Sequence, residues 1–256
     1  MFVPVLIFLG TILEMLPISS STHLRALQFL WCHDFLCTNE SLIECIDFLT
    51  HGPILIVIVL FFFKRWKLLL RKLLSNHHYA INYIYCGFLV ELITLLFYVA
   101  INYVSVSCQF APIGFLITSA VLLSESFLNR PVVTTWHWKH SLLLGIAQGL
   151  AFLPGVSRLG ITFFAARWCG FSQANALELS FMIEVPISAA AFAKGIYDCH
   201  KIPELDLLNW QIAFSMVIAI GVAYCLLCLV SRIIQRGYWW IFGIYTLGCA
   251  VLLRSM

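Results

Sequence analysis

Charged residues are scarce in this chain. Asp, Glu, Lys and Arg make up only 11% of its 256 residues, hydrophobic residues make up 62%, and the mean hydropathy is +0.95. A soluble domain of this length cannot hide so much apolar surface, so the composition excludes one and predicts an integral membrane protein. The net charge is only +3 and is spread along the chain, which argues against nucleic acid as a partner.

Two other signals are absent or weak. The N-terminal stretch MFVPVLIFLG has no positive n-region and no small-residue cleavage site, so we expect no removable signal peptide. The only CxxC, at Cys225 and Cys228, lies inside an apolar run, as Cys86 does, and packing explains these cysteines better than metal binding. One polar loop allows a single disulfide among its cysteines, which are Cys32, Cys37 and Cys45.

Charge patterning predicts the topology. Residues 31–51 are acidic and include no Lys or Arg, whereas the apolar run 54–63 is followed at once by basic residues, namely Lys64, Arg65, Lys67, Arg71 and Lys72. Because basic loops stay cytoplasmic, we expect the acidic loop to face outward. Attraction of the basic cluster to anionic lipids is compatible with the same placement.

Apolar runs predict about five or six full crossings and two short broken helices. The short helices, 2–13 and 141–153, fall below the roughly 20 residues that a hydrocarbon core of about 30 Å requires. Each runs into a proline break, at Pro17 and Pro154, which is typical of a re-entrant segment. The expected crossings are 54–63 (short for a span), 83–103, 112–123, 174–193 with Pro186 inside, 207–230 and 238–253.

The first break concentrates polar side chains. Glu14 and His23 flank three consecutive serines, Ser19, Ser20 and Ser21. One stretch of ten residues after an apolar helix thus contains a carboxylate, an imidazole and three hydroxyls. This concentration of polar groups predicts a functional site. The alternative is a set of interfacial residues that face water.

The second break, LPGVSRLGIT, carries Arg158 between the hydroxyls of Ser157 and Thr162. Gly160 leaves room for a ligand to approach the backbone. A guanidinium offers a rigid fork of donors that suits phosphate, and a charge between membrane segments usually marks a working site. The alternative is an interfacial loop whose Arg158 extends to lipid headgroups.

Both breaks share the pattern Leu-Pro-x-x-Ser, one near the start of each half, and interrupted helices at matching places point to a repeat fold. We therefore predict an all-α integral membrane protein, a polytopic helical bundle with two re-entrant broken-helix elements in an inverted repeat. Residues 1–256 form a single membrane domain with repeat halves at about 1–130 and 138–256. We expect both breaks to build one pocket. The matching residues are Leu16, Pro17 and Ser20, and Leu153, Pro154 and Ser157.

The two breaks resemble the signature regions of undecaprenyl-diphosphate phosphatase, the bacitracin-resistance family of bacterial membrane proteins. The family's ExxxE-F-L-P-(I/V)-S-S-(S/T)-G-H-(L/M) is matched at Glu14, at 16–21 and at 23–24, and its PGxSRSGxT between Pro154 and Thr162. The segment ALELSFMIEVP, 176–186, resembles the family's A-x-x-F-S-F-L-L-x-(I/V)-P. This chain departs from the family pattern at Gly10, Thr22, Leu159 and Glu184.

The departure at Gly10 bears on the site, because the family's glutamate at that position is implicated in metal binding and activity. We expect Glu184, beside the Pro186 break, to supply the lost carboxylate. The alternative is a carboxylate that burial keeps neutral.

The resemblance implies hydrolysis of undecaprenyl diphosphate to undecaprenyl phosphate and inorganic phosphate, which recycles the lipid carrier for peptidoglycan synthesis and confers bacitracin resistance. Arg158 would bind the phosphate oxygens, and Glu14 would hold a divalent cation, Mg²⁺ or Ca²⁺. Ser20 would be the nucleophile with His23 as its base, and attack by water that His23 activates is the alternative. The further substrate-binding residues are Ser19, Ser21, Ser157, Gly160 and Thr162.

The same resemblance implies a multi-pass protein of the bacterial plasma membrane. Its expected partners are a polyprenyl diphosphate and membrane lipid, with a homodimer left open, and we expect the site to face the extracytoplasmic side. The rival functions are a polyprenyl-phosphate transporter or flippase without hydrolysis and an inactive relative that serves as a scaffold.

Overall fold

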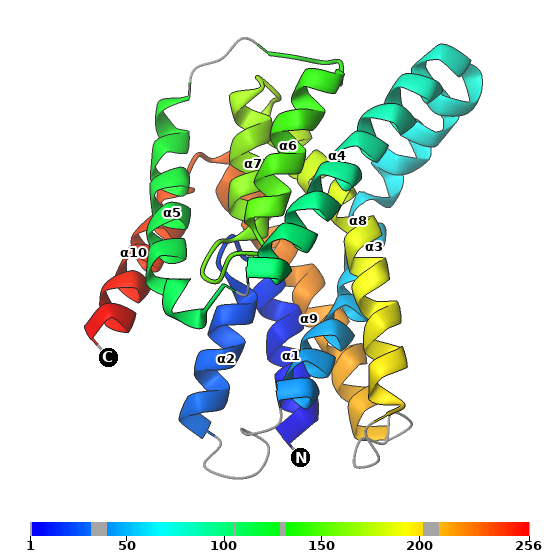
Figure 1. Cartoon of the computed structure of the whole chain (residues 1–256). Helices are drawn as coiled ribbons and strands as arrows, with labels where there is room; N and C mark the ends of the chain where they lie inside the picture. Colours follow the sequence, from blue (N-terminus) through cyan, green and yellow to red (C-terminus); the bar gives the residue numbers. More distant parts are fainter. Residues whose placement is uncertain (1, 32–39, 105, 129–131, 202–209, 256) are drawn as a thin grey trace. The chain divides into compact units, whose positions relative to one another are not determined.

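The computed structural model describes residues 2–31, 40–104, 106–128, 132–201 and 210–255, and every regular element in these ranges is a helix (Figure 1). The first half contains α1 (Phe2–Glu14), α2 (Ser20–Trp31), α3 (Glu40–Ser75), α4 (His77–Val104) and α5 (Ala111–Ser124). The second half contains α6 (Trp138–Leu150), α7 (Arg158–Trp168), α8 (Gln173–Cys199), α9 (Trp210–Gln235) and α10 (Trp240–Ser255). Short 3₁₀ turns, η2 (Cys108–Phe110) and η3 (Glu125–Phe127), flank α5.

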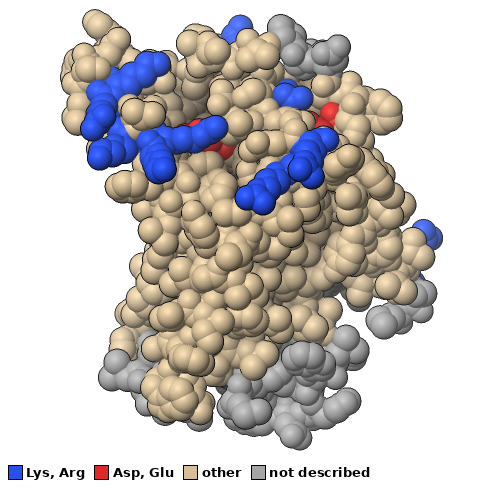
Figure 2. Space-filling model, turned by 180° about the vertical axis from the view of Figure 1, so that it is seen from behind, with Lys and Arg blue, Asp and Glu red and all other residues tan. Residues whose placement is uncertain are grey.

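Helix length and composition confirm a polytopic membrane protein. Among the described residues, α3, α4, α8 and α9 are long and apolar enough to cross a membrane. Of the expected crossings, those at α5 and α10 are shorter than the roughly 20 residues of a full span. Most of the face shown in Figure 2 carries no charged side chain, as expected of a surface in contact with lipid.

The prediction of a short span at 54–63 is wrong, because α3 extends on both sides of that run over 36 residues. At 1.5 Å per residue the helix is about 54 Å long, well beyond a hydrocarbon core of about 30 Å. Its first turns lie in the acidic segment, where Cys45, Ile46 and Leu49 are buried. Packing of these side chains therefore extends the helix where polarity predicted a loop.

Contacts divide the chain into two compact units. The first comprises residues 1–16, 20–61 and 184–230, and the second comprises 17–19, 62–183 and 231–256. Buried residues of α1, α2, α3, α8 and α9 form an apolar core in the first unit. In the second, Trp239 is fully buried and its ring lies 3.9 Å from that of Phe163, centroid to centroid.

The two halves of the sequence have the same order of helix lengths. Each half has two short helices, two long ones and a shorter one, with 13, 12, 36, 28 and 14 residues in the first and 13, 11, 27, 26 and 16 in the second. Pro53 is the fourteenth residue of α3, and Pro186 is the fourteenth residue of α8. This order is compatible with the predicted repeat, while the inversion of its halves and the re-entrant placement of the short helices stay predictions.

A disulfide joins the first unit across a long stretch of sequence. Cys45, near the start of α3, is bonded to Cys199, the last residue of α8, with 6.0 Å between their Cα atoms. Cys45 therefore does not form the disulfide that the polar loop allowed with its neighbours, while Cys32 and Cys37 lie outside the described residues. Close packing of α3 on α8 continues at Gly195, where a Cβ atom would meet Phe48 Cβ at 2.8 Å.

Candidate active site

The first break turns the chain between α1 and α2. The last turn of α1 tightens, because the N–H groups of Met15 and Leu16 bond to carbonyls three residues earlier, each at 3.1 Å. Pro17 lacks an N–H and ends the helix. Across the turn, Ser20 Oγ donates a hydrogen bond to Glu14 Oε1 at 2.5 Å. The break thus brings together two of the predicted catalytic residues.

This hydrogen bond is buried. Glu14 is 9% exposed, Ser20 7% and Ser19 3%. A bond from a hydroxyl to a carboxylate is strong where water is excluded, so the pair holds the serine oxygen in one orientation. The half-buried His23 follows Ser20 by three residues on α2, a spacing that places both on one helix face. The roles of Ser21 and His23 stay predictions.

The position of the missing family glutamate is filled from neighbouring helices. A Cβ atom on Gly10 would lie 2.6 Å from Thr50 Cγ2 of α3 and 2.9 Å from Leu24 Cδ1 of α2. Any larger side chain there would have to displace Thr50 or Leu24. The candidate replacement, Glu184 of α8, belongs to the same unit and is 3% exposed. Whether it serves the site stays a prediction.

The second break is packed main chain to main chain against α5. Gly155 has φ +86°, in the left-handed region that favours glycine, and a Cβ atom there would lie 2.2 Å from the carbonyl oxygen of Ala111. On the other side of this contact, a Cβ on Gly114 would lie 2.0 Å from the carbonyl oxygen of Pro154. The backbones of the loop and of α5 therefore touch, and the loop is fixed relative to that helix.

Thr118 of α5 fastens the same loop. Its hydroxyl donates to the Gly155 carbonyl at 3.0 Å and accepts from the Ser157 N–H at 2.9 Å. Sequence reasoning missed this residue, because a threonine inside an apolar helix 37 residues upstream carries no local signal of the contact.

Arg158 begins α7 and is half-buried, while Ser157 and Thr162 are each 1% exposed. Ser157 caps the helix, since its Oγ accepts from the Gly160 N–H at 3.1 Å. Ser157 Oγ is the acceptor in this bond, so its hydroxyl proton can still be donated to a ligand. The Thr162 hydroxyl instead donates to the Arg158 carbonyl at 2.8 Å, so its predicted hydrogen bond to phosphate requires that bond to open.

The helix that carries Arg158 suits an anion. The N-terminus of α7 adds the positive end of its dipole to the guanidinium charge. At the other end, Arg167 Nε donates to Glu125 Oε1 of η3 at 2.9 Å. Glu125 is 4% exposed, so this ion pair is sheltered from water and fixes α7. The predicted common pocket of the two breaks stays a prediction.

A polar contact inside the second unit was not assigned from the sequence. Gln148, 1% exposed on α6, donates to the Ile183 carbonyl at 3.2 Å and lies 3.5 Å from Glu91 Oε2 of α4. The carbonyl lies three residues before Pro186, where the missing proline N–H disturbs the hydrogen bonds of α8. Gln148 thereby links three helices one turn before the second break.

We expect acid to destabilise the start of α6, outside the membrane spans. His140 Nδ1 accepts from the His137 N–H at 3.3 Å, and its ring packs on Phe171. Burial lowers the pKa of His140 below its ordinary value, and the neighbouring His137 lowers it further. The unfolded chain therefore binds a proton at His140 more readily than the folded chain does. The folded state keeps its full stability above about pH 6.5 and loses part of it as the pH falls through the lowered pKa of His140 in the folded protein.

Thermal unfolding in detergent at pH 7.5 and pH 5.5 measures this effect. We expect a lower melting temperature at pH 5.5 and a smaller difference in His140→Gln. The matched control is His78→Gln, which removes an exposed imidazole at the start of α4. An equal pH effect in the parent protein and in His140→Gln would contradict the assignment.

The residues present fit a divalent cation only in part. Mg²⁺ is commonly bound through one or two carboxylates together with substrate phosphates. Glu14 offers such a carboxylate, and the described residues contain no cluster of three or more His, Cys, Asp or Glu side chains arranged to hold a metal. A cation at this site would therefore depend on phosphate oxygens of the substrate, and it stays a prediction.

Several bacterial proteins are similar to this chain over part or nearly all of its length. A family model described as "Bacitracin resistance protein BacA" matches residues 5–252. An undecaprenyl-diphosphatase of Thermotoga petrophila is 28% identical over 242 residues, 93% of each chain, and one of Borrelia recurrentis is 27% identical over 262 residues, 96% of this chain and 94% of the relative. Undecaprenyl-diphosphatase 2 of Mesorhizobium japonicum is 38% identical over 116 residues, 44% of each chain. With a match over nearly its whole length, this chain belongs to the bacitracin resistance protein BacA family.

Proposed function

We propose that this chain hydrolyses undecaprenyl diphosphate to undecaprenyl phosphate and inorganic phosphate. Membership of the BacA family supports the proposal, as do relatives named undecaprenyl-diphosphatase in several bacteria. The observation that carries it is the buried bond from Ser20 to Glu14, because it pairs a hydroxyl with a group able to take its proton.

In the serine route, Ser20 Oγ forms a bond to the terminal phosphorus while the bond from that phosphorus to the bridging oxygen breaks. Undecaprenyl phosphate leaves, and the serine proton passes to Glu14, whose Oε1 lies 2.5 Å from Ser20 Oγ, in place of His23, the base that the sequence predicts for this route. Water then cleaves the phosphoserine, releases phosphate and restores the serine. In the alternative route, water attacks the diphosphate directly, with His23 as the base.

Phosphoryl transfer depends mainly on positioning and charge neutralisation, which the second break supplies. Arg158 binds phosphate oxygens in this proposal, and the Ser157 hydroxyl and the N-terminus of α7 add donors. A divalent cation held by Glu14 would neutralise further charge on the two phosphates.

We further propose that the site is reached from the extracytoplasmic side. Disulfides persist in oxidising compartments, which supports an outward position for Cys45 and Cys199. Along α3, Cys45 and Lys64 are 19 residues apart, about 28 Å, which is close to the thickness of the hydrocarbon core. The basic cluster then lies at the cytoplasmic face, as the sequence predicts.

The test is phosphate release from undecaprenyl diphosphate by purified protein, with Mg²⁺ or Ca²⁺ and with a chelator. We expect Arg158→Ala to lower the rate by about 10²–10³-fold, the effect of removing a group that stabilises developing charge. Arg158→Lys should recover only part of the rate, because an ammonium lacks the two-pronged geometry. Arg236→Ala, which removes an exposed arginine after α9, is the matched control.

This assay also separates hydrolysis from its rival. A polyprenyl-phosphate transporter without hydrolytic activity would release no phosphate from the lipid. Absence of release by the unmodified protein under every cation condition would contradict the proposed function.

A further inference from the structure

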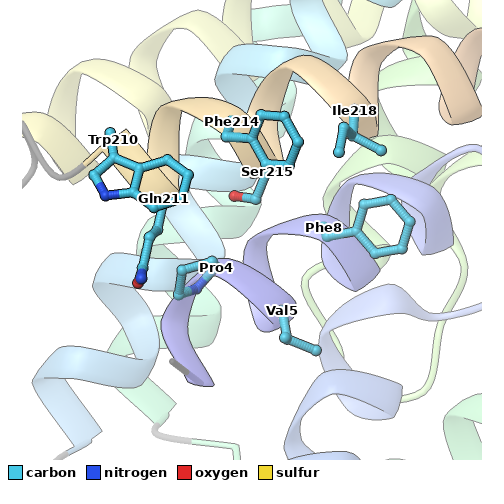
Figure 3. Close-up of a pocket in the computed structure, with 8 residues that line it drawn as sticks. All are labelled: Pro4, Val5, Phe8, Trp210, Gln211, Phe214, Ser215 and Ile218. Atoms are coloured by element: carbon cyan, nitrogen blue, oxygen red, sulfur yellow. The ribbon is translucent and has the colours of Figure 1, made fainter.

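Two apolar grooves open on the described surface, one in each unit. In the first unit, Pro4, Val5 and Phe8 of α1 face Trp210, Phe214 and Ile218 of α9 across a groove of about 360 Å³ (Figure 3). In the second unit, α5, α6 and α7 enclose a groove of about 280 Å³. Both are lined almost wholly by apolar side chains, so shape and chemistry alone do not distinguish their occupants.

The groove of the second unit has a floor of small residues and walls of large ones. Ala147 of α6 and Ala165 of α7 are 4% and 3% exposed and form the floor. Ile146 and Trp168, 40% and 48% exposed, stand beside them as walls. The helices α6 and α7 are neighbours (Figure 1). A groove with this lining accepts a narrow apolar chain.

Helix register connects this groove to Arg158. The lining residues of α7, Ile161, Phe164, Ala165 and Trp168, follow Arg158 by three, six, seven and ten residues. At 3.6 residues per turn, Ala165 lies almost two full turns after Arg158, on the same side of the helix. From Ile161 to Trp168 the groove follows α7 for about 10 Å. A molecule whose anionic group binds at Arg158 can therefore place an attached apolar chain in this groove.

The groove of the first unit lacks this connection. Glu14, at the end of α1, follows Val5 by nine residues, which places the two about 180° apart around the helix. Gly10, one turn before Glu14, faces Thr50 and Leu24. The site side of α1 is thus turned away from the α1–α9 groove.

We infer that the α5–α6–α7 groove binds the isoprene units next to the diphosphate of the substrate. This inference rests on the proposed function and adds to it a determinant of chain-length preference. A short prenyl diphosphate would engage Arg158 and leave much of the groove empty, whereas the long lipid would fill it.

The experiment compares kcat/KM for undecaprenyl diphosphate with that for the five-carbon dimethylallyl diphosphate. Trp168→Ala removes one wall of the groove, and Leu150→Ala shortens a half-buried side chain at the end of α6 that also lines it. We expect each to lower the preference for the long substrate by roughly tenfold, through KM more than kcat, as expected from the loss of a buried apolar contact of about 1–2 kcal/mol. Phe214→Ala, which opens the α1–α9 groove, is the matched control and should leave the ratio unchanged.

The outcomes separate the two claims. An unchanged ratio in both Trp168→Ala and Leu150→Ala, with phosphate still released, would overturn the groove assignment and leave the proposed function standing. A loss of preference in Phe214→Ala alone would overturn it in favour of the α1–α9 groove. No release from either substrate by the unmodified protein would overturn the proposed function and this inference together. Size-exclusion profiles verify that each variant is folded.

Discussion

Replacement of Glu14 with glutamine is expected to lower the rate of phosphate release by about 10²–10⁴-fold, the usual contribution of a positioned proton acceptor. The amide oxygen of glutamine can still accept the hydrogen bond from Ser20, so the first break keeps its shape. The side chain can no longer take the serine proton or hold a cation. The measurement is kcat with undecaprenyl diphosphate over a range of Mg²⁺ concentrations.

Two variants control this experiment. Thr11→Val changes another buried hydroxyl of α1, one that bonds to the Ile7 carbonyl at 2.8 Å, and it should keep most of the activity. Ser20→Ala distinguishes the two routes, because the serine route requires a phosphorylated Ser20 that trapping can detect. Turnover at the parent rate by Glu14→Gln would exclude Glu14 from the chemistry.

A second large effect is expected at Gly155. Gly155→Ala places a Cβ atom 2.2 Å from the Ala111 carbonyl oxygen and forces a non-glycine residue to φ +86°. The left-handed conformation alone costs about 1–3 kcal/mol, and the backbone clash adds to it because neither main chain can move aside. We expect little folded protein, measured as monodisperse yield and melting temperature after purification.

Three other glycines separate the two causes. Gly114→Ala introduces a backbone clash alone, against the Pro154 carbonyl, and Gly237→Ala introduces a positive φ alone, since nothing lies within 4 Å of its Cβ position. Gly221→Ala, inside α9 with open space around it, introduces neither. We expect the melting temperature to fall most for Gly155, less for Gly114 and Gly237, and not at all for Gly221. A Gly155→Ala protein as stable as Gly221→Ala would contradict the packing of the loop on α5.

The sequence predicted the parts of this molecule that local chemistry determines. Pro17 and Pro154 interrupt apolar runs, so both breaks and their polar residues could be located without a structure. Glu14 and Ser20 are six residues apart, and their meeting follows from the turn that the proline imposes. Composition was sufficient to predict an integral membrane protein, and the apolar runs with their proline breaks predicted its helices.

What the sequence could not predict depends on contacts between distant segments. Cys199 lies 154 residues from Cys45, and no local pattern pairs them. The true start of α3 depends on packing of its polar first turns, and the role of Thr118 depends on a loop far along the chain.

The contact between Gly155 and α5 also bears on how the sequence can change over time. Because main-chain atoms meet there, and every amino acid has the same main chain, side chains on the outer faces of α5 can be exchanged without moving the arginine loop. Substitution is constrained chiefly at Gly114 and Gly155, where a side chain would intrude on the contact, and at Thr118, whose hydroxyl bonds to the loop. Homologues that differ widely over α5 can therefore keep their arginine in the same place.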